Sequence, residues 1–212
     1  MQDFTAKTLN QFLEELASSA PVPGGGSGSA LAGALSAGLL SMVCNLTIGK
    51  KGYESAQEDM QRILARSEEI RLTLPRLLQA DTEVYSQVMA ASRMPRKTDE
   101  EKAARDAAMQ KALQAAAEIP LQIAALCAEI VDLCLPAAQQ GNKWAVSDAG
   151  VGVLLAEASM RGALLNVEIN LASIKDASFV SATRERMARI TAGKADVKEQ
   201  VMSVVLRTIQ GS

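Results

Sequence analysis

The feature that most restricts the fold of this chain is a long helical pattern between Met60 and Val88. Apolar side chains recur there at steps of three and four, interrupted by one small residue and one skipped position. The stripe consists of Met60, Ile63, Ser67, Ile70, Leu74, Leu77, Val84 and Val88. This spacing predicts one continuous helix whose apolar face covers a core or a partner helix. Pro75 lies inside the run and removes one backbone donor, so we expect a local kink.

Composition extends the helical prediction to the rest of the chain. Of the 212 residues, 36 are alanine and only six are aromatic, whereas strands prefer β-branched and aromatic side chains. The expected helices cover residues 8–18, 27–48, 53–91, 99–119, 121–140 and 147–174, with two shorter helices after them. Pro120 is expected to separate or kink two of these helices. The sequence therefore predicts one all-α domain, residues 1–212, built as a multi-helix bundle with long, kinked helices.

The segment Ser27–Ile48 is uncharged over 22 residues, which is long enough to cross a membrane. It also carries four serines, an asparagine and a threonine, so a buried central helix is the better interpretation and we expect no membrane partner. The N-terminus has no signal-peptide pattern, and three cysteines fit no metal or disulfide framework. These observations predict a cytoplasmic protein. The net charge of −2 gives no general attraction for nucleic acid.

The chain contains no histidine, which excludes Ser-His and Cys-His nucleophile pairs and any imidazole-ligated metal. Proton chemistry, if present, must come from Asp, Glu, Lys, Tyr or Cys. Asp81 is a candidate because it occupies the skipped position of the apolar stripe. Burial there would raise its pKa toward the range useful for proton transfer, but a structural Asp paired with a neighbouring helix fits the pattern equally well.

Two further patterns are compatible with ligand binding. Asn166 and Asn170 stand one turn apart and could present amide groups to a heterocycle, although such pairs more commonly tie helices together. Gly24, Gly25, Gly26 and Ser27 precede a helix, where glycines allow close backbone approach and free N–H groups favour anions. Lys50 and Lys51 follow that helix and could hold an anionic tail, or simply be a solvated pair.

Three segments together resemble one known family. They are PVPGGGSGSALAGALSAGLLSMVCNLTIGKKGY, ADTEVYSQVMAASRMP and GNKWAVSDAGVGVLLAEASMRGALLNVEINL. The order and motifs resemble the formiminotetrahydrofolate cyclodeaminase and methenyltetrahydrofolate cyclohydrolase family over essentially the whole chain. The resemblance implies an all-α homodimer that acts on one-carbon derivatives of tetrahydrofolate, with no metal and no cofactor. Because the formiminotransferase domains of animal relatives are absent here, we expect a stand-alone microbial form.

The resemblance also assigns roles to residues. It places the catalytic aspartate at Asp81 and assigns a folate pocket to Gly24, Gly25, Gly26, Asn142, Asp148, Asn166 and Asn170. Lys50 and Lys51 match a basic pair that would receive the glutamate tail. Trp144 departs from the family pattern, which usually has smaller or polar residues there, so it alters the expected pocket.

The sequence leaves three functions open. The first is methenyltetrahydrofolate cyclohydrolase, which adds water to the carbon bridging N5 and N10, with Asp81 as general acid and base. The second is formiminotetrahydrofolate cyclodeaminase, which closes the same bridge and releases ammonia. The expected absence of a transferase domain favours the first slightly. The third is a non-catalytic helical interaction protein, which predicts no folate binding and a stabilising effect of Asp81→Leu.

Overall fold

The structure, a computed structural model, describes residues 3–211 and is helical throughout. The helices are α1 (Leu9–Leu16), α2 (Gly25–Asn45), α3 (Gln57–Ser92), α4 (Asp99–Gln140), α5 (Val146–Leu171), α6 (Ala177–Thr191) and α7 (Lys194–Gln210). Short 3₁₀ turns, Glu54–Ala56 and Lys143–Ala145, precede α3 and α5. The all-α prediction is confirmed.

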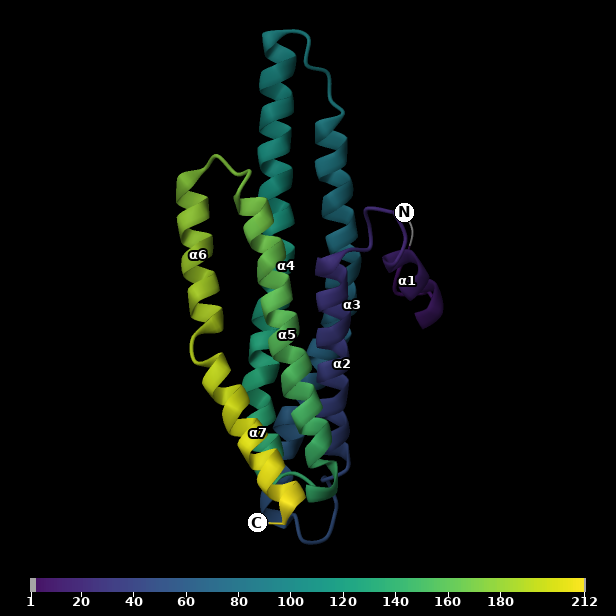
Figure 1. Cartoon of the computed structure of the whole chain (residues 1–212), viewed down its shortest axis with the longest axis vertical. Helices are drawn as coiled ribbons and strands as arrows, with labels where there is room; N and C mark the ends of the chain where they lie inside the picture. The colour runs from purple at the N-terminus through teal and green to yellow at the C-terminus, as the bar shows by residue number, and fades with distance from the viewer. Residues whose placement is uncertain (1–2, 212) are drawn as a thin grey trace.

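Four helices, α2 to α5, form the centre of the bundle, with α6 and α7 alongside α4 and α5 (Figure 1). The end of α3 and the start of α4 project beyond the other helices at one end of the molecule (Figure 1). At that tip Thr98 caps α4 in a capping box with Glu101, which satisfies the free N–H groups of the first turn. The short α1 lies to the side, near α2 and α3 (Figure 1).

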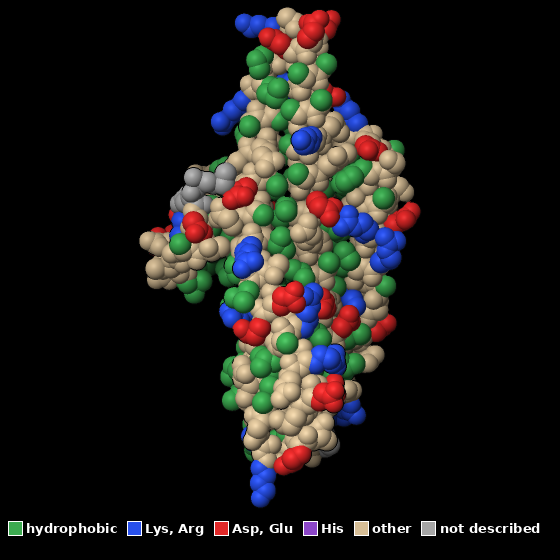
Figure 2. All heavy atoms as spheres, turned by 180° about the vertical axis from the view of Figure 1, so that it is seen from behind, with side chains coloured by type: hydrophobic (Ala, Val, Ile, Leu, Met, Phe, Trp, Pro, Cys, Tyr) green, Lys and Arg blue, Asp and Glu red, His purple; other side chains and the backbone are tan. Residues whose placement is uncertain are grey.

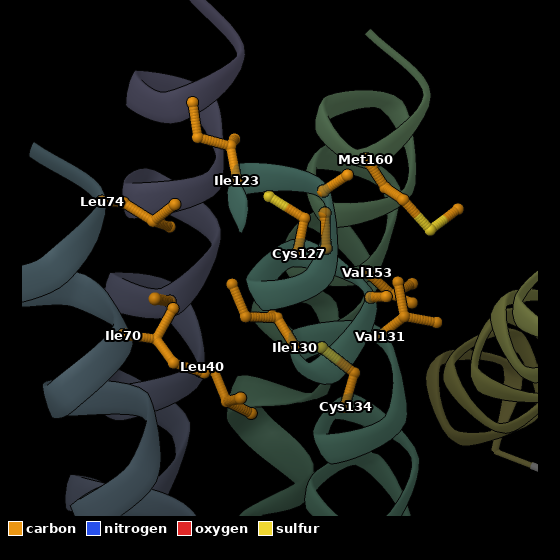
Figure 3. Close-up of a cluster of buried hydrophobic side chains, with 14 of the residues drawn as sticks. Leu40, Ile70, Leu74, Ile123, Cys127, Ile130, Val131, Cys134, Val153 and Met160 are labelled. Carbon is orange, nitrogen blue, oxygen red and sulfur yellow. The ribbon is translucent and has the colours of Figure 1, made fainter. Parts of the chain in front are cut away.

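The core consists of the apolar faces that the periodicity predicts. Leu40 of α2, Ile70 and Leu74 of α3 and Ile130 of α4 meet in it, together with α5 side chains (Figure 3). Alanine and glycine allow the helices to approach closely, because a side chain at Gly33 would collide with the thiol of Cys127. All three cysteines are buried and reduced, and burial raises the pKa of the Cys127 thiol to about 12. They pack as small hydrophobes.

Pro120 does not separate two helices, which corrects that alternative of the sequence prediction. The helix α4 runs without a break from Asp99 to Gln140, through Pro120. A proline at this position cannot donate a hydrogen bond to the carbonyl of Ala116, four residues earlier. The side-chain Nδ2 of Asn170 donates to that carbonyl instead, at 3.1 Å. A side chain of α5 therefore replaces the missing backbone donor of α4.

Three helical segments are long and apolar enough to cross a membrane by length and composition: α2, α4 and Lys143–Leu171. In the structure they pack against one another, and about half of the most apolar stretch of each segment is buried within the bundle. The segment 27–48 lies largely in α2, a central helix of the bundle as the sequence predicts, but one side of it is exposed at Leu35, Met42 and Leu46. Figure 2 shows Lys, Arg, Asp and Glu side chains spread over the whole length of one face. The cytoplasmic location stays a prediction.

Candidate active site

A cavity of about 400 Å³ lies where the start of α2 meets α3, α4 and α5. Its polar lining comes from Asp81 and Tyr85 of α3, Asn166 and Asn170 of α5, and the following Ser173. The backbone of residues 24–26 closes one side, and apolar side chains complete the wall. Asp81 is the only charged residue among the described residues that line the cavity. The structure thus brings together four segments that lie far apart in the sequence.

The carboxylate of Asp81 sits against the first turn of α2. The Ser27 hydroxyl donates to Oδ2 of Asp81 at 2.9 Å, and the Ser27 backbone also bonds to this carboxyl. Burial raises the pKa of Asp81 above its ordinary value of 3.8, and the hydrogen bonds from Ser27 oppose part of that rise. The helix N-terminus tempers the cost of burying a negative charge at this position. Asp81 is therefore held in place and available to exchange a proton.

The glycines of the α2 start are needed for contacts within the protein. A Cβ added at Gly26 would lie 2.4 Å from Oδ1 of Asp81, which is far inside van der Waals contact. A Cβ at Gly25 would lie 3.3 Å from Nδ2 of Asn166, which is also tight. The sequence analysis expected these glycines to admit a ligand. In the structure their first role is to let the backbone approach Asp81 and Asn166.

The two asparagines of α5 both form hydrogen bonds within the protein and line the cavity, which are the two roles that the sequence left open. Their amide nitrogens are used within the protein: Nδ2 of Asn166 donates to Gly162, and Nδ2 of Asn170 donates to the backbone of Ala116 and Asn166. Both side chains also line the cavity. Within the part of the chain that the structure describes, no donor bonds to their amide oxygens. These two amide oxygens are therefore available as hydrogen-bond acceptors for a ligand in the cavity.

Sequence reasoning missed Tyr85 as a residue of the site. Tyr85 lies one helical turn after Asp81, and both line the cavity. The spacing of four residues was the available signal, because side chains four apart share a helix face. The phenol adds an aromatic surface and a hydroxyl to a chain that holds few aromatic residues.

Other predicted residues lie at the far end of the molecule. They are Lys50, Lys51, Asn142 and Asp148, with Trp144 between the last two. Because α2 has 21 residues, its far end is about 30 Å from the Asp81 contact at its start. Asn142 joins the ends of two helices, donating from Nδ2 to Leu46 and from its backbone to Thr47. The structure does not bring these residues to Asp81 within one chain.

A family model described as formiminotransferase-cyclodeaminase matches residues 8–189. The chain belongs to the formiminotransferase-cyclodeaminase family. It is 43% identical over 199 residues to a methenyltetrahydrofolate cyclohydrolase of Methylorubrum extorquens, covering 94% of this chain and 96% of that protein. The crystal structure of formiminotetrahydrofolate cyclodeaminase from Thermotoga maritima matches with a TM-score of 0.87 and 29% identity, covering 97% and 98% of the two chains.

This member of the formiminotransferase-cyclodeaminase family also matches longer animal proteins. It is 31% identical over 189 residues to formimidoyltransferase-cyclodeaminase of Rattus norvegicus, covering 89% of this chain and 35% of that protein. The chain therefore spans about a third of this longer relative. The family resemblance seen in the three sequence segments is confirmed.

Proposed function

We propose that this protein is a methenyltetrahydrofolate cyclohydrolase. The observation that carries the proposal is the 43% identity to the Methylorubrum cyclohydrolase over 96% of that protein's length. The cavity supports it, because it combines one buried carboxylate with acceptors and an aromatic wall. The substrate would be 5,10-methenyltetrahydrofolate, and the product 10-formyltetrahydrofolate.

Asp81 carries the proton traffic in this proposal. Its carboxylate takes a proton from a water molecule, whose oxygen bonds to the cationic carbon between N5 and N10. The resulting tetrahedral adduct opens when the bond from carbon to N5 breaks, and Asp81 returns the proton to N5. The hydroxyl proton of the adduct leaves to solvent as the formyl carbonyl forms on N10. Such acid–base help accelerates a reaction by about 10²–10⁴.

The rest of the cavity orients the substrate. The pterin ring carries N–H donors, which match the free amide oxygens of Asn166 and Asn170. The side chain of Tyr85 lies on the same helix face as Asp81 and offers a surface for the ring. We assign Gly24, Gly25 and Gly26 to the cavity wall.

Cyclodeamination of 5-formiminotetrahydrofolate is the second candidate, favoured by the close structural match to the Thermotoga cyclodeaminase. N10 attacks the formimino carbon attached to N5, and ammonia leaves as the same methenyl bridge forms. Both reactions pass through a tetrahedral carbon at one place, so a single carboxylate serves either. The cavity geometry is compatible with both substrates.

We further propose that the chain is a homodimer. An apolar surface, called here the α2–α5 face, combines large exposed side chains of α2, α5 and the cap of α2. It consists of Leu35, Met42, Leu46, Val151, Leu154, Leu165 and Ile169. The helices α2 and α5 are about 30 and 40 Å long, which is long enough for a standard interface of roughly 800 Å² per partner. Light scattering on the purified protein tests this: the mass of a single chain would refute it.

The decisive experiment assays the purified protein on both folates, watching methenyl absorbance disappear or appear. The expected result is hydrolysis of methenyltetrahydrofolate that exceeds formation from the formimino substrate. The Asp81→Asn variant should fold and lose most turnover, whereas Asp196→Asn, an exposed control on α7, should keep it. Full activity of Asp81→Asn would exclude the mechanism, and absence of folate binding by calorimetry would favour an interaction protein.

A further inference from the structure

The outward-facing residues of α2, called here the α2 stripe, belong to the α2–α5 face. They are small in one half of the helix and large in the other half. Near the cavity the outward positions are Gly25, Gly28 and Ala32, and toward the other end they are Leu35, Leu39, Met42 and Leu46. The stripe carries no charge along this length. If a second copy packs on this surface in the opposite direction, the large side chains of each copy lie opposite the small residues of the other.

A second cavity, of about 420 Å³, marks the small half of this stripe. Gly28 and Ala32 of α2 face Ala158 and Gly162 of α5 across it. Ser159, which is 3% exposed, also lines it, and its hydroxyl has no hydrogen-bond partner among the described residues. This cavity adjoins the active-site cavity, because Gly25 and Asn166 line both. The groove is therefore open to an occupant that brings apolar volume and a polar atom.

We propose that a second copy of the chain packs antiparallel on the α2–α5 face and completes the active site with its own Lys50 and Lys51. This inference rests on the proposed folate function and deepens it. The two-fold axis lies in the interface, perpendicular to the helices, beside Leu35. The register then pairs Gly25 with Leu46, Gly28 with Met42, Ala32 with Leu39 and Leu35 with itself.

The same axis also suits α5. Gly162 lies beside Ser29 and Gly152 lies beside Leu39, so α2 and α5 run antiparallel and Leu35 is level with about residue 155. A reversal about that level pairs Val151 with Gly162, Leu155 with Ala158 and Trp144 with Ile169. One rotation thus places Val151 and Leu155 of α5 opposite small residues, and it brings the exposed apolar side chains of Trp144 and Ile169 into contact. Arg161 stands at the edge of the stripe and pairs with Glu157 of its own helix.

Size also decides against a parallel arrangement. If the two-fold axis ran parallel to the helices, α2 of one copy would pack against α5 of the other, and each residue would face one at the same level along the bundle. The small residues Gly28 and Ala32 would then face Gly162 and Ala158, which leaves the groove empty. Interfaces are packed as densely as protein interiors, which favours the antiparallel register.

In the antiparallel register the far end of one copy reaches the active site of the other. Residues 46–51 of the partner subunit come to lie beside residues 21–25, and Pro21, Val22 and Gly25 line the active-site cavity. The partner's Trp144, 79% exposed in the single chain, covers Ile169 at the mouth of that cavity. The residues that lie about 30 Å from Asp81 in one chain thereby approach it in the pair.

The lysine pair supplies what the cavity lacks. Folates end in glutamate carboxylates, and the cavity of one chain is lined by no cationic side chain among its described residues. Lys50 and Lys51 are exposed, and no carboxylate of residues 3–211 pairs with them; the Lys50 ammonium lies 5.8 Å from the ring centre of Tyr53. Their charge is therefore free to bind the glutamate carboxylates of a substrate held by the other subunit.

Cysteine crosslinking tests the register without reference to activity. Leu35→Cys should form a disulfide between two copies under mild oxidation, because residue 35 meets itself at the axis. Leu72→Cys on α3 is the matched control, because Leu72 is 54% exposed and Leu35 is 56% exposed, and it should stay monomeric on a denaturing gel. The three native cysteines are buried and should not contribute. Failure of Leu35→Cys to crosslink would overturn the antiparallel register.

Mixed dimers test the shared site. The first variant is Asp81→Asn, and the second carries Lys50→Ala and Lys51→Ala. The second should raise KM for methenyltetrahydrofolate triglutamate at least about tenfold, with little change in kcat. A double variant at two exposed lysines off the face, Lys97→Ala with Lys102→Ala, should leave KM unchanged.

When the two impaired variants are mixed, unfolded and refolded together, half of the dimers are heterodimers with one intact site. The mixture should therefore recover about a quarter of wild-type activity at low substrate concentration. No recovery from two impaired variants would place the lysines in the same chain as their site, and an unchanged KM would remove their role. Full activity of Asp81→Asn would instead sink the proposed mechanism, while the crosslink would still test the register.

A third variant separates the two copies. Gly28→Phe should fold, because a Cβ at Gly28 meets nothing within 4 Å in its own chain, but it collides with the partner's Met42. We expect a monomer by light scattering, a tenfold or larger rise in KM, and red-shifted emission from the sole tryptophan, Trp144. A Gly28→Phe dimer with wild-type KM would contradict the proposal.

Discussion

Gly26→Ala is the smallest change that should displace the carboxylate of Asp81, the proposed catalytic group. The new methyl group would lie 2.4 Å from Oδ1 of Asp81 and 2.7 Å from Cγ. An ordinary contact at this position is 3.4 Å or longer, so the carboxylate and the α2 backbone must separate by about 1 Å. The hydrogen bond from Ser27, at 2.9 Å, would stretch with that movement.

The expected effect on catalysis is large and the effect on folding is small. A misplacement of about 1 Å at a reacting group costs roughly 10²-fold in rate, which corresponds to about 3 kcal/mol of transition-state stabilisation. Alanine is a better helix former than glycine by up to about 1 kcal/mol, which offsets part of the local strain. Gly26→Ala should therefore remain folded.

Steady-state hydrolysis of methenyltetrahydrofolate measures kcat and KM, and circular dichroism measures Tm. Gly38→Ala in the same helix is the matched control, because its added Cβ lies no closer than 3.8 Å to the side chain of Arg71. It should match the wild type in both measurements. Wild-type kcat in Gly26→Ala would refute the idea that Asp81 acts from its observed position.

Three further predictions concern protonation and the proline contact. Ser27→Ala removes a donor that lowers the pKa of Asp81, so the acid limb of the kcat/KM profile should move to higher pH; an unmoved limb would contradict this. Burial raises the pKa of Asp81 in the folded state above 3.8, so protonation of Asp81 stabilises the fold fully below that pH, and this stabilisation is lost as pH rises through the raised pKa. Asp81→Asn should therefore raise Tm at pH 7, by less near pH 4, and an equal gain at both would argue against it. Asn170→Ala should cost about 1–3 kcal/mol in denaturant unfolding by leaving the Ala116 carbonyl unpaired, and much less after Pro120→Ala; additive losses would disprove the coupling.

The fold could be predicted from the sequence because its signals are local. Steps of three and four place Ile63, Ile70 and Leu74 in the core, and Thr98 marks the start of α4. Pro120 misled the prediction because what compensates for it, Asn170, is distant in sequence. A side-chain donor from another helix leaves no trace in the local pattern.

The candidate site could be predicted only in part, for a related reason. Asp81 stood out because a charge in an apolar stripe is unusual, and the cavity does contain it. The glycines were identified, but their contact with Asp81 is a matter of tertiary packing. The motif that contains Lys50 and Lys51 indicates what these residues bind, but it does not indicate how far they lie from Asp81. Within one chain the length of α2 separates them from Asp81.

The solitary charge in the cavity has a consequence for turnover. The methenyl substrate is a cation at its bridge carbon, so it brings to Asp81 a counterion that the described residues lining the cavity do not provide. Its binding should lower the pKa of Asp81, placing the acid limb of kcat below that of kcat/KM. Hydrolysis then removes the positive charge from the ligand. Product affinity falls at the moment of reaction, and the chemistry itself prepares the release of 10-formyltetrahydrofolate.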